Sequence, residues 1–148
     1  MSESLVTVVL QQQQDYRFDV QFEGGVPPLV ADEPPPLGQS QGPSPVQLLA
    51  AAVGNCLSDS LLFALRKFKQ APEPLRAQVE AQVGRNAEGR VRVLAMTARL
   101  TLGVPAARLE HLDRVLGQFE SYCTVTQSVG QGIPITVSVF DADGVQLK

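Results

Sequence analysis

The chain of 148 residues has no tryptophan, one histidine and two cysteines. Zinc sites need three or four Cys, His or carboxylate ligands at short spacing, which two distant thiols and one imidazole do not provide. Acidic residues outnumber basic ones by 15 to 12, for a net charge of −3, and no basic cluster interrupts this balance. A nucleic-acid-binding surface is therefore not expected. The sequence also lacks a glycine-rich phosphate loop and a serine-nucleophile motif.

Targeting and membrane signals are also scarce. The N-terminus, 1–4, is acidic, and the apolar stretch that follows, 5–10, is shorter than the apolar region of a signal peptide. The most apolar segment of the chain is interrupted by Gln47, Asn55 and Asp59, which favours a buried core helix over a membrane span. We therefore expect a cytoplasmic protein with no membrane partner, in a compartment that keeps thiols reduced.

The first part of the chain predicts short strands. Residues 5–10 are β-prone, and 16–22 alternate between apolar and polar side chains, as in a half-buried strand. Residues 23–25 predict a turn that makes these two strands a hairpin. The segment 26–42 is rich in proline and glycine and predicts a loop, with one short edge strand near Leu29.

A long helix is predicted from Ser44 to about Lys69. Ser44 suits the N-cap, Pro45 the first helical position, and Gln47 completes a capping box. The following residues are apolar nearly all round, which is typical of a buried helix. Proline at 72 and 74 ends the segment.

The remaining elements predict an α+β protein. Strands are expected at 75–83, 91–102 and 133–140, one helix from Pro105 to about Tyr122, and a short helical segment at 125–129. The order is β-β-α-β-β-α-β, which predicts a mostly antiparallel sheet packed around one long buried central helix. No linker divides the chain, so 1–148 is expected to form a single domain.

Local sequence leaves two interpretations open for each thiol. Cys56 lies about three turns into the predicted helix, too far from its N-terminus for the helix dipole to activate it, so a small core residue is one interpretation. Cys123 follows the second predicted helix and could fill a gap there. Nucleophilic chemistry is the alternative for both.

The segments around the two cysteines resemble the OsmC/Ohr family, the osmotically inducible and organic-hydroperoxide-resistance proteins. Pro45, Leu48 and Leu49 precede Cys56 as in the central helix of that family. The run from Cys123 to Gln127 is similar to its Cys-x-Val-Ser-Gln motif, with threonine in place of serine. Segments 42–68 and 119–139 carry the resemblance most clearly.

The resemblance implies a thiol-dependent peroxidase that reduces organic hydroperoxides in oxidative stress defence. Cys56 would be the nucleophile that becomes a sulfenic acid, and Cys123 would resolve it through a disulfide. No cofactor or metal is implied. The implied partners are a second copy of the chain in an intertwined homodimer, an organic hydroperoxide, and a dithiol reductant such as a lipoylated protein.

Two positions depart from the pattern of peroxidase members. Val46 stands where these carry an acidic residue that orients an arginine, and a branched alkane cannot bind a guanidinium. Arg17 is the one arginine before residue 66 and is the candidate cation, although it lies on the polar face of its strand. Asp59 lies on nearly the same helical face as Cys56 and is expected to face solvent or an interface. The alternative is an OsmC-like protein without efficient peroxidase activity, acting as a small-molecule-binding or redox-sensing module.

Overall fold

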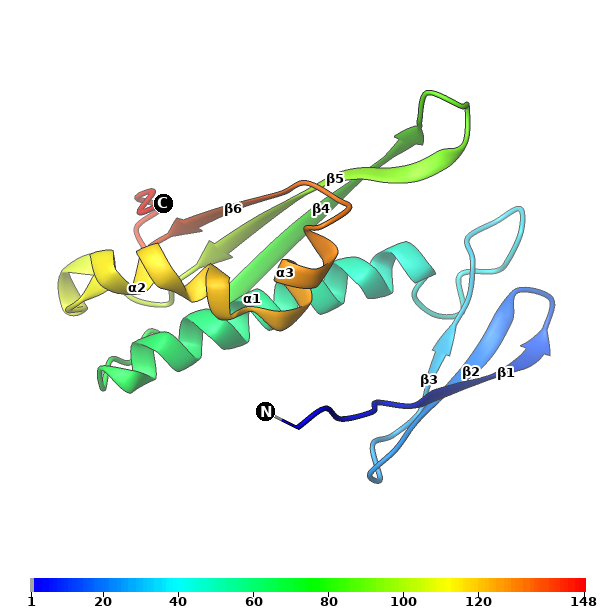
Figure 1. Ribbon diagram of the computed structural model, residues 1–148, viewed down its shortest axis with the longest axis horizontal. Coiled ribbons are helices and arrows are strands. Elements are labelled where there is room, and N and C mark those ends of the chain that lie inside the picture. Colours follow the sequence, from blue (N-terminus) through cyan, green and yellow to red (C-terminus); the bar gives the residue numbers. More distant parts are fainter. Residues whose placement is uncertain (1) are drawn as a thin grey trace. The chain divides into compact units, whose positions relative to one another are not determined.

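The computed structural model describes residues 2–148, which divide into two compact units (Figure 1). The first extends to Leu48 and the second runs from Leu49 to Lys148. The boundary falls inside helix α1, Pro45–Lys67. The expectation of a single domain over 1–148 stays a prediction, and each unit is described by itself below.

The N-terminal unit contains an antiparallel sheet of β1 (Val8–Gln14), β2 (Arg17–Phe22) and β3 (Leu29–Ala31), in that order. The short strand at Leu29 was predicted and is confirmed. The predicted hairpin turn was misplaced, because β1 runs through the glutamine tract and turns at Asp15, whose φ is 51°. The turn at 23–25 instead joins β2 to β3.

A buried carboxylate organises the loop after β3. Asp32 is 3% exposed and accepts backbone N–H bonds from Glu33, Gln39 and Gln41, at 2.8, 3.2 and 3.1 Å. Burial alone would raise the pKa of Asp32, but these three donors and the charge of Arg17 together lower it. The proline-rich loop is therefore ordered around an ionised side chain rather than an apolar core.

Helix α1 begins as the sequence predicts. The Ser44 N–H donates to Gln47 Oε1 at 2.9 Å, and the Gln47 N–H donates to Ser44 Oγ at 3.2 Å, so the capping box is formed. Within the C-terminal unit, one face of the helix is buried. The opposite face is exposed at Asn55, Asp59 and Phe63, so a single chain buries this apolar helix on one side only.

By length and composition alone, α1 is long and apolar enough to cross a membrane, since an 18-residue window within it has a mean hydropathy of 1.7. The core helix of a globular fold meets the same criterion. Leu57, Leu61 and Leu65 of α1 have no exposed surface and pack in the core of the C-terminal unit, which accounts for the apolar composition of that face.

The C-terminal unit is built on a sheet of β4 (Arg76–Arg85), β5 (Val91–Thr101) and β6 (Ile135–Phe140). β4 and β5 are antiparallel, whereas β5 and β6 are parallel. Gly54 allows α1 to approach β4 closely, since a Cβ there would lie 2.8 Å from Val79 Cγ2. The predicted α+β class is confirmed, with two three-stranded sheets and one long helix.

The prediction of a single helix from Pro105 to Tyr122 is wrong. The chain forms 3-10 helix η1 (Ala106–Arg108), α2 (Leu112–Gln118) and 3-10 helix η2 (Phe119–Tyr122), followed by the predicted short helix, α3 (Thr124–Val129). The break lies at His111, whose φ is 60° and whose ring stacks on Phe68 at 4.7 Å between centroids. His111 is exposed.

Candidate active site

The fold brings the two cysteines together within the C-terminal unit. Cys56 projects from the middle of α1 and is partly exposed, whereas Cys123 lies between η2 and α3 with no exposed surface. Both are free thiols. The Cys56 thiol is near enough to that of Cys123 to affect its ionisation. A separation of 67 positions in sequence is thus closed by the packing of η2 and α3 against the core that contains α1.

The environment of Cys123 favours its protonated form. Burial raises the pKa of the Cys123 thiol, and the neighbouring Cys56 thiol adds to this, while the hydroxyl of Thr126 opposes it. The Cys123 thiol donates to Thr126 Oγ1 at 3.0 Å. Thr126 itself is buried, so the hydroxyl that replaces the family's serine is held beside the sulfur.

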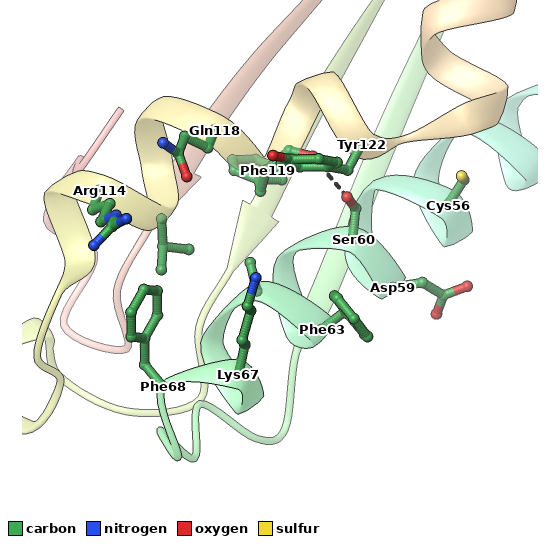
Figure 2. A pocket seen from close by; sticks show the side chains of 12 residues that line it. Cys56, Asp59, Ser60, Phe63, Lys67, Phe68, Arg114, Gln118, Phe119 and Tyr122 are labelled. Carbon is green, nitrogen blue, oxygen red and sulfur yellow. Dashed lines mark hydrogen bonds between the residues drawn. The ribbon is translucent and has the colours of Figure 1, made fainter.

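Cys56 borders a pocket of about 520 Å³ that lies wholly within the C-terminal unit. One wall is a stripe of α1 and the other is formed by α2 and η2, as Figure 2 shows. The Ser60 hydroxyl donates to the Phe119 carbonyl at 2.6 Å and joins the two walls. Phe63 and Tyr122 are 73% and 74% exposed, so aromatic surface faces the opening. The pocket therefore places a thiol beside an apolar ligand space.

Charges are separated along this pocket. Asp59 lies near Cys56 and accepts a hydrogen bond from Asn55 Nδ2 at 3.1 Å. Lys67 and Arg114 lie toward the other end, where the guanidinium is 5.7 Å from the Phe68 ring centroid. Within residues 2–148 no ion pair involves Asp59, Lys67 or Arg114, so the pocket carries opposite charges at its two ends.

Arg17 belongs to the N-terminal unit, whereas both cysteines belong to the C-terminal unit. It is half-buried at the start of β2 and donates to Gln14 Oε1 at 3.0 Å. The register of β2 and β3 pairs Phe18 with Ala31, which places Arg17 across from Asp32 at the end of the ladder. Val46 lies in the first turn of α1 and offers no acceptor. The carboxylate near Arg17 is therefore Asp32.

Sequence reasoning missed the cations of the pocket and the part played by Asp32. The spacing of Cys56, Ser60, Phe63 and Lys67 at i, i+4, i+7 and i+11 marks one face of a helix and was a usable signal. Arg114 and Asp32 had no such signal, because their positions depend on the break at His111 and on the path of the loop after β3.

The chain is similar in sequence and in fold to known proteins. The model of the family described as OsmC-like protein matches residues 38–138. No curated protein sequence matches the chain. Solved structures do, at low sequence identity, and so show the fold.

Three of these structures illustrate the similarity in fold. An OsmC-like protein of Vibrio cholerae is 16% identical, with a TM-score of 0.79 over 93% of this chain and 100% of that one. An organic hydroperoxide resistance protein OsmC of Legionella pneumophila is 16% identical, with a TM-score of 0.68 and coverage of 93% and 98%. An organic hydroperoxide resistance protein of Elizabethkingia anophelis, with thiocyanate bound, is 15% identical, with a TM-score of 0.68 and coverage of 93% and 98%. Since the family model spans more than half of the sequence, including both cysteines, the chain belongs to the OsmC-like protein family.

Proposed function

We propose that the protein is a thiol-dependent peroxidase that reduces organic hydroperoxides. The observation that carries this proposal is the unequal exposure of two neighbouring thiols. Cys56 is partly exposed on an apolar pocket, whereas Cys123 has no exposed surface and lies behind it. A peroxide in the pocket would meet Cys56 first, which supports Cys56 as the nucleophile and Cys123 as the resolving thiol.

The first half of the cycle oxidises Cys56. Its thiolate attacks the terminal oxygen of ROOH, the O–O bond breaks, and RO⁻ leaves and takes a proton to give ROH. Sulfur is oxidised to the sulfenic acid and the peroxide is reduced to an alcohol. The apolar lining suits the R group and limits access of water to the sulfenic acid.

The second half restores the thiols. Cys123 loses its proton and attacks the Cys56 sulfur, the S–OH bond breaks, and hydroxide leaves as water with that proton. The product is a Cys56–Cys123 disulfide. An external dithiol, for which a lipoylated protein is the proposed source, then reduces the disulfide and is itself oxidised to a disulfide. Placing this cycle in the cytoplasm is consistent with resting thiols.

Arg17 is the proposed cation for the Cys56 thiolate. Its neighbours Gln14 and Asp32 lie beside the side chain at the start of β2 and would take the orienting role that Val46 cannot perform. The assignment requires the Arg17 guanidinium to reach Cys56 in the assembled protein.

A homodimer is part of the proposal. Val8, Val9 and Leu10 of β1 are 42%, 54% and 56% exposed, and Phe63 adds exposed aromatic surface on α1. Apolar surface of this kind on two elements of one chain is typical of an interaction surface. A second copy of the chain would cover it.

The test is oxidation by a peroxide followed by mass spectrometry. One equivalent of cumene hydroperoxide should remove two hydrogens from the wild type, about 2 Da, as the Cys56–Cys123 disulfide forms. Cys56→Ser should keep an unreacted Cys123 thiol, while Cys123→Ser should accumulate the sulfenic acid of Cys56. Two unmodified thiols in the wild type after prolonged exposure would overturn the proposal.

Val46 favours a second candidate function, a small-molecule-binding or redox-sensing module of the same fold. Such a module would form the disulfide in a single slow turnover. Steady-state consumption of hydroperoxide with a dithiol present separates the two, because a sensor would show oxidation without sustained turnover.

A further inference from the structure

The sheet of the C-terminal unit has two chemically different faces (Figure 1). On one face, Val79, Ala98 and Val139 pack in the apolar core that contains α1. Because side chains alternate along a strand, the residues between these project from the opposite face. That face carries a second pocket, of about 510 Å³, which shares no lining residue with the pocket beside Cys56. Its lining contains two arginines, one carboxylate, and several amide and hydroxyl groups.

The strand register brings the two arginines together on this face. Arg76 of β4 is paired with Thr101 of β5, and Gln78 of β4 is paired with Arg99 of β5. Arg76 and Arg99 are therefore diagonal neighbours, with their backbones about 7–8 Å apart. Two long side chains from such positions can reach one anion, and the hydroxyl of Thr101 lies at the position between them.

Neither guanidinium is neutralised by a carboxylate. Within residues 2–148, Arg76 and Arg99 form no ion pair. A terminal nitrogen of Arg76 donates to Gln78 Oε1 at 3.5 Å, a long and therefore weak hydrogen bond. The carboxylate of the pocket, Glu80, instead accepts from Gln78 Nε2 at 3.3 Å. The pocket thus carries an excess of positive charge on a chain whose net charge is −3.

Arg99 is also held in place before any ligand binds. Its guanidinium carbon lies 3.7 Å from the centroid of the Phe140 ring, in a cation-π contact. Stacking of this kind uses the face of the guanidinium and leaves the N–H groups along its edge free to donate. A planar pair of donors in a fixed orientation suits two oxygens of one oxyanion, and less side-chain entropy is lost when the anion binds.

We infer that this pocket binds a small, hydroxylated organic phosphate, whose phosphate group is held between Arg76 and Arg99. A phosphate monoester offers three acceptor oxygens and nearly two negative charges at neutral pH, which matches two guanidinium groups. The volume falls within the range of small-molecule sites, about 300–1,000 Å³, and leaves room for an organic part. Gln78, Thr97 and Ser138 supply amide and hydroxyl groups for that part, which suits hydroxyls rather than an apolar chain.

Titration calorimetry of the reduced full chain tests the site with three probes, glucose 6-phosphate, inorganic phosphate and glucose. The wild type should bind glucose 6-phosphate most tightly, inorganic phosphate more weakly, and glucose not measurably. Arg76→Met and Arg99→Met should each weaken binding of glucose 6-phosphate by about fivefold, the size of one partly exposed ion pair. Arg99→Lys should restore only part of the loss, because an ammonium keeps the charge without the planar pair of donors.

Arg92→Met is the matched control, since Arg92 is exposed on the same strand as Arg99 but lies outside the pocket lining. It should retain the affinity of the wild type, and all variants should keep the wild-type denaturation midpoint. No binding of glucose 6-phosphate at millimolar concentration, or an equal loss in Arg92→Met, would overturn the site. Equal affinities for glucose 6-phosphate and inorganic phosphate would overturn the organic part of the assignment.

A single-stranded RNA oligonucleotide serves as the competing probe, because its phosphates could meet the same arginines. Tighter binding of the RNA than of glucose 6-phosphate would overturn the small-molecule assignment. The inference goes beyond the proposed peroxidase function and does not rest on it. Neither Cys56 nor its oxidation enters these measurements, so the phosphate site and the peroxidase function stand or fail separately.

Discussion

The two three-stranded sheets of this chain are stabilised in different ways. Among the described residues, the N-terminal unit buries two hydrophobic side chains, Val20 and Ala31, whereas the C-terminal unit buries thirteen. Every residue of β1 is exposed, while the inner face of β5 is closed by α1 and its neighbours. A three-stranded sheet without a covered apolar face is at most marginally stable by itself.

Each unit nevertheless contains a buried aspartate that accepts backbone hydrogen bonds. Asp32 and Asp141 are each almost fully buried, and each accepts three backbone N–H bonds. In the C-terminal unit, the hydrogen bonds to Asp141 supplement a large apolar core. In the N-terminal unit, Asp32 is the main internal anchor. The C-terminal unit therefore contains most of the buried apolar side chains of the described residues, while the N-terminal unit relies more on its loop anchor.

The largest effect is expected from the core of the C-terminal unit. Leu61→Ala removes a side chain with no exposed surface, and should lower the free energy of unfolding by about 2–5 kcal/mol. Leu10→Ala in β1 is the control and should change it by less than about 0.5 kcal/mol at low protein concentration. Chemical denaturation measures both. An equal loss in the two variants at that concentration would remove the contrast between the units, whereas a Leu10 effect that grows with concentration would identify a second copy as its cover.

A smaller effect is expected at the start of α1, where the two units join. Ser44→Ala breaks the capping box, and should lower the free energy of unfolding by about 1 kcal/mol. Ser44→Gly should cost only a few tenths. If Ser44→Ala leaves the denaturation midpoint unchanged, the first turn of α1 does not contribute to the unfolding transition of the core. It would then be stabilised with the N-terminal unit.

The smallest effect on global unfolding is expected from Asp32→Asn. The pKa of Asp32 is lowered in the folded protein, so its contribution is present above the ordinary carboxyl pKa and is lost as pH falls through the folded value. The Asp32→Asn substitution should therefore lower the amide-exchange protection of residues 33–42 at neutral pH, and remove the acid-induced loss of protection that is expected of the wild type there.

Asp141→Asn is the matched control for that measurement. Backbone donors, the Ala106 N–H first, lower the pKa of Asp141, so exchange should change at residues 106 and 143–145 instead. If Asp32→Asn leaves residues 33–42 protected at neutral pH, Asp32 does not anchor the N-terminal unit.

Much of this architecture could be predicted from the sequence, for reasons tied to particular residues. Ser44, Pro45 and Gln47 define the start of α1 locally, and the alternation in β2 defines a strand without reference to other elements. The break at His111 could not be found in this way, because the apolar spacing continues through it and the stacking partner, Phe68, is distant in sequence.

In the candidate site, too, some residues could be identified from local sequence and others only from the packing. Cys56 and Cys123 were identified through motifs that surround each of them, and Arg17 remains a proposal because its role depends on assembly. Lys67 and Arg114 come from separate helices, and only the packing of α2 and α1 around one pocket brings them to the same end.

The burial of Cys123 also sets the direction in which the proposed disulfide would be reopened. A reductant cannot touch a sulfur without exposed surface, so it must attack the sulfur of Cys56 and expel Cys123. Thiols of high pKa are poor leaving groups, and burial raises the pKa of Cys123. Thr126 can reverse its hydrogen bond and donate to the departing sulfur. The mixed disulfide with the reductant should therefore be trapped on Cys56, with Thr126→Val slowing its formation.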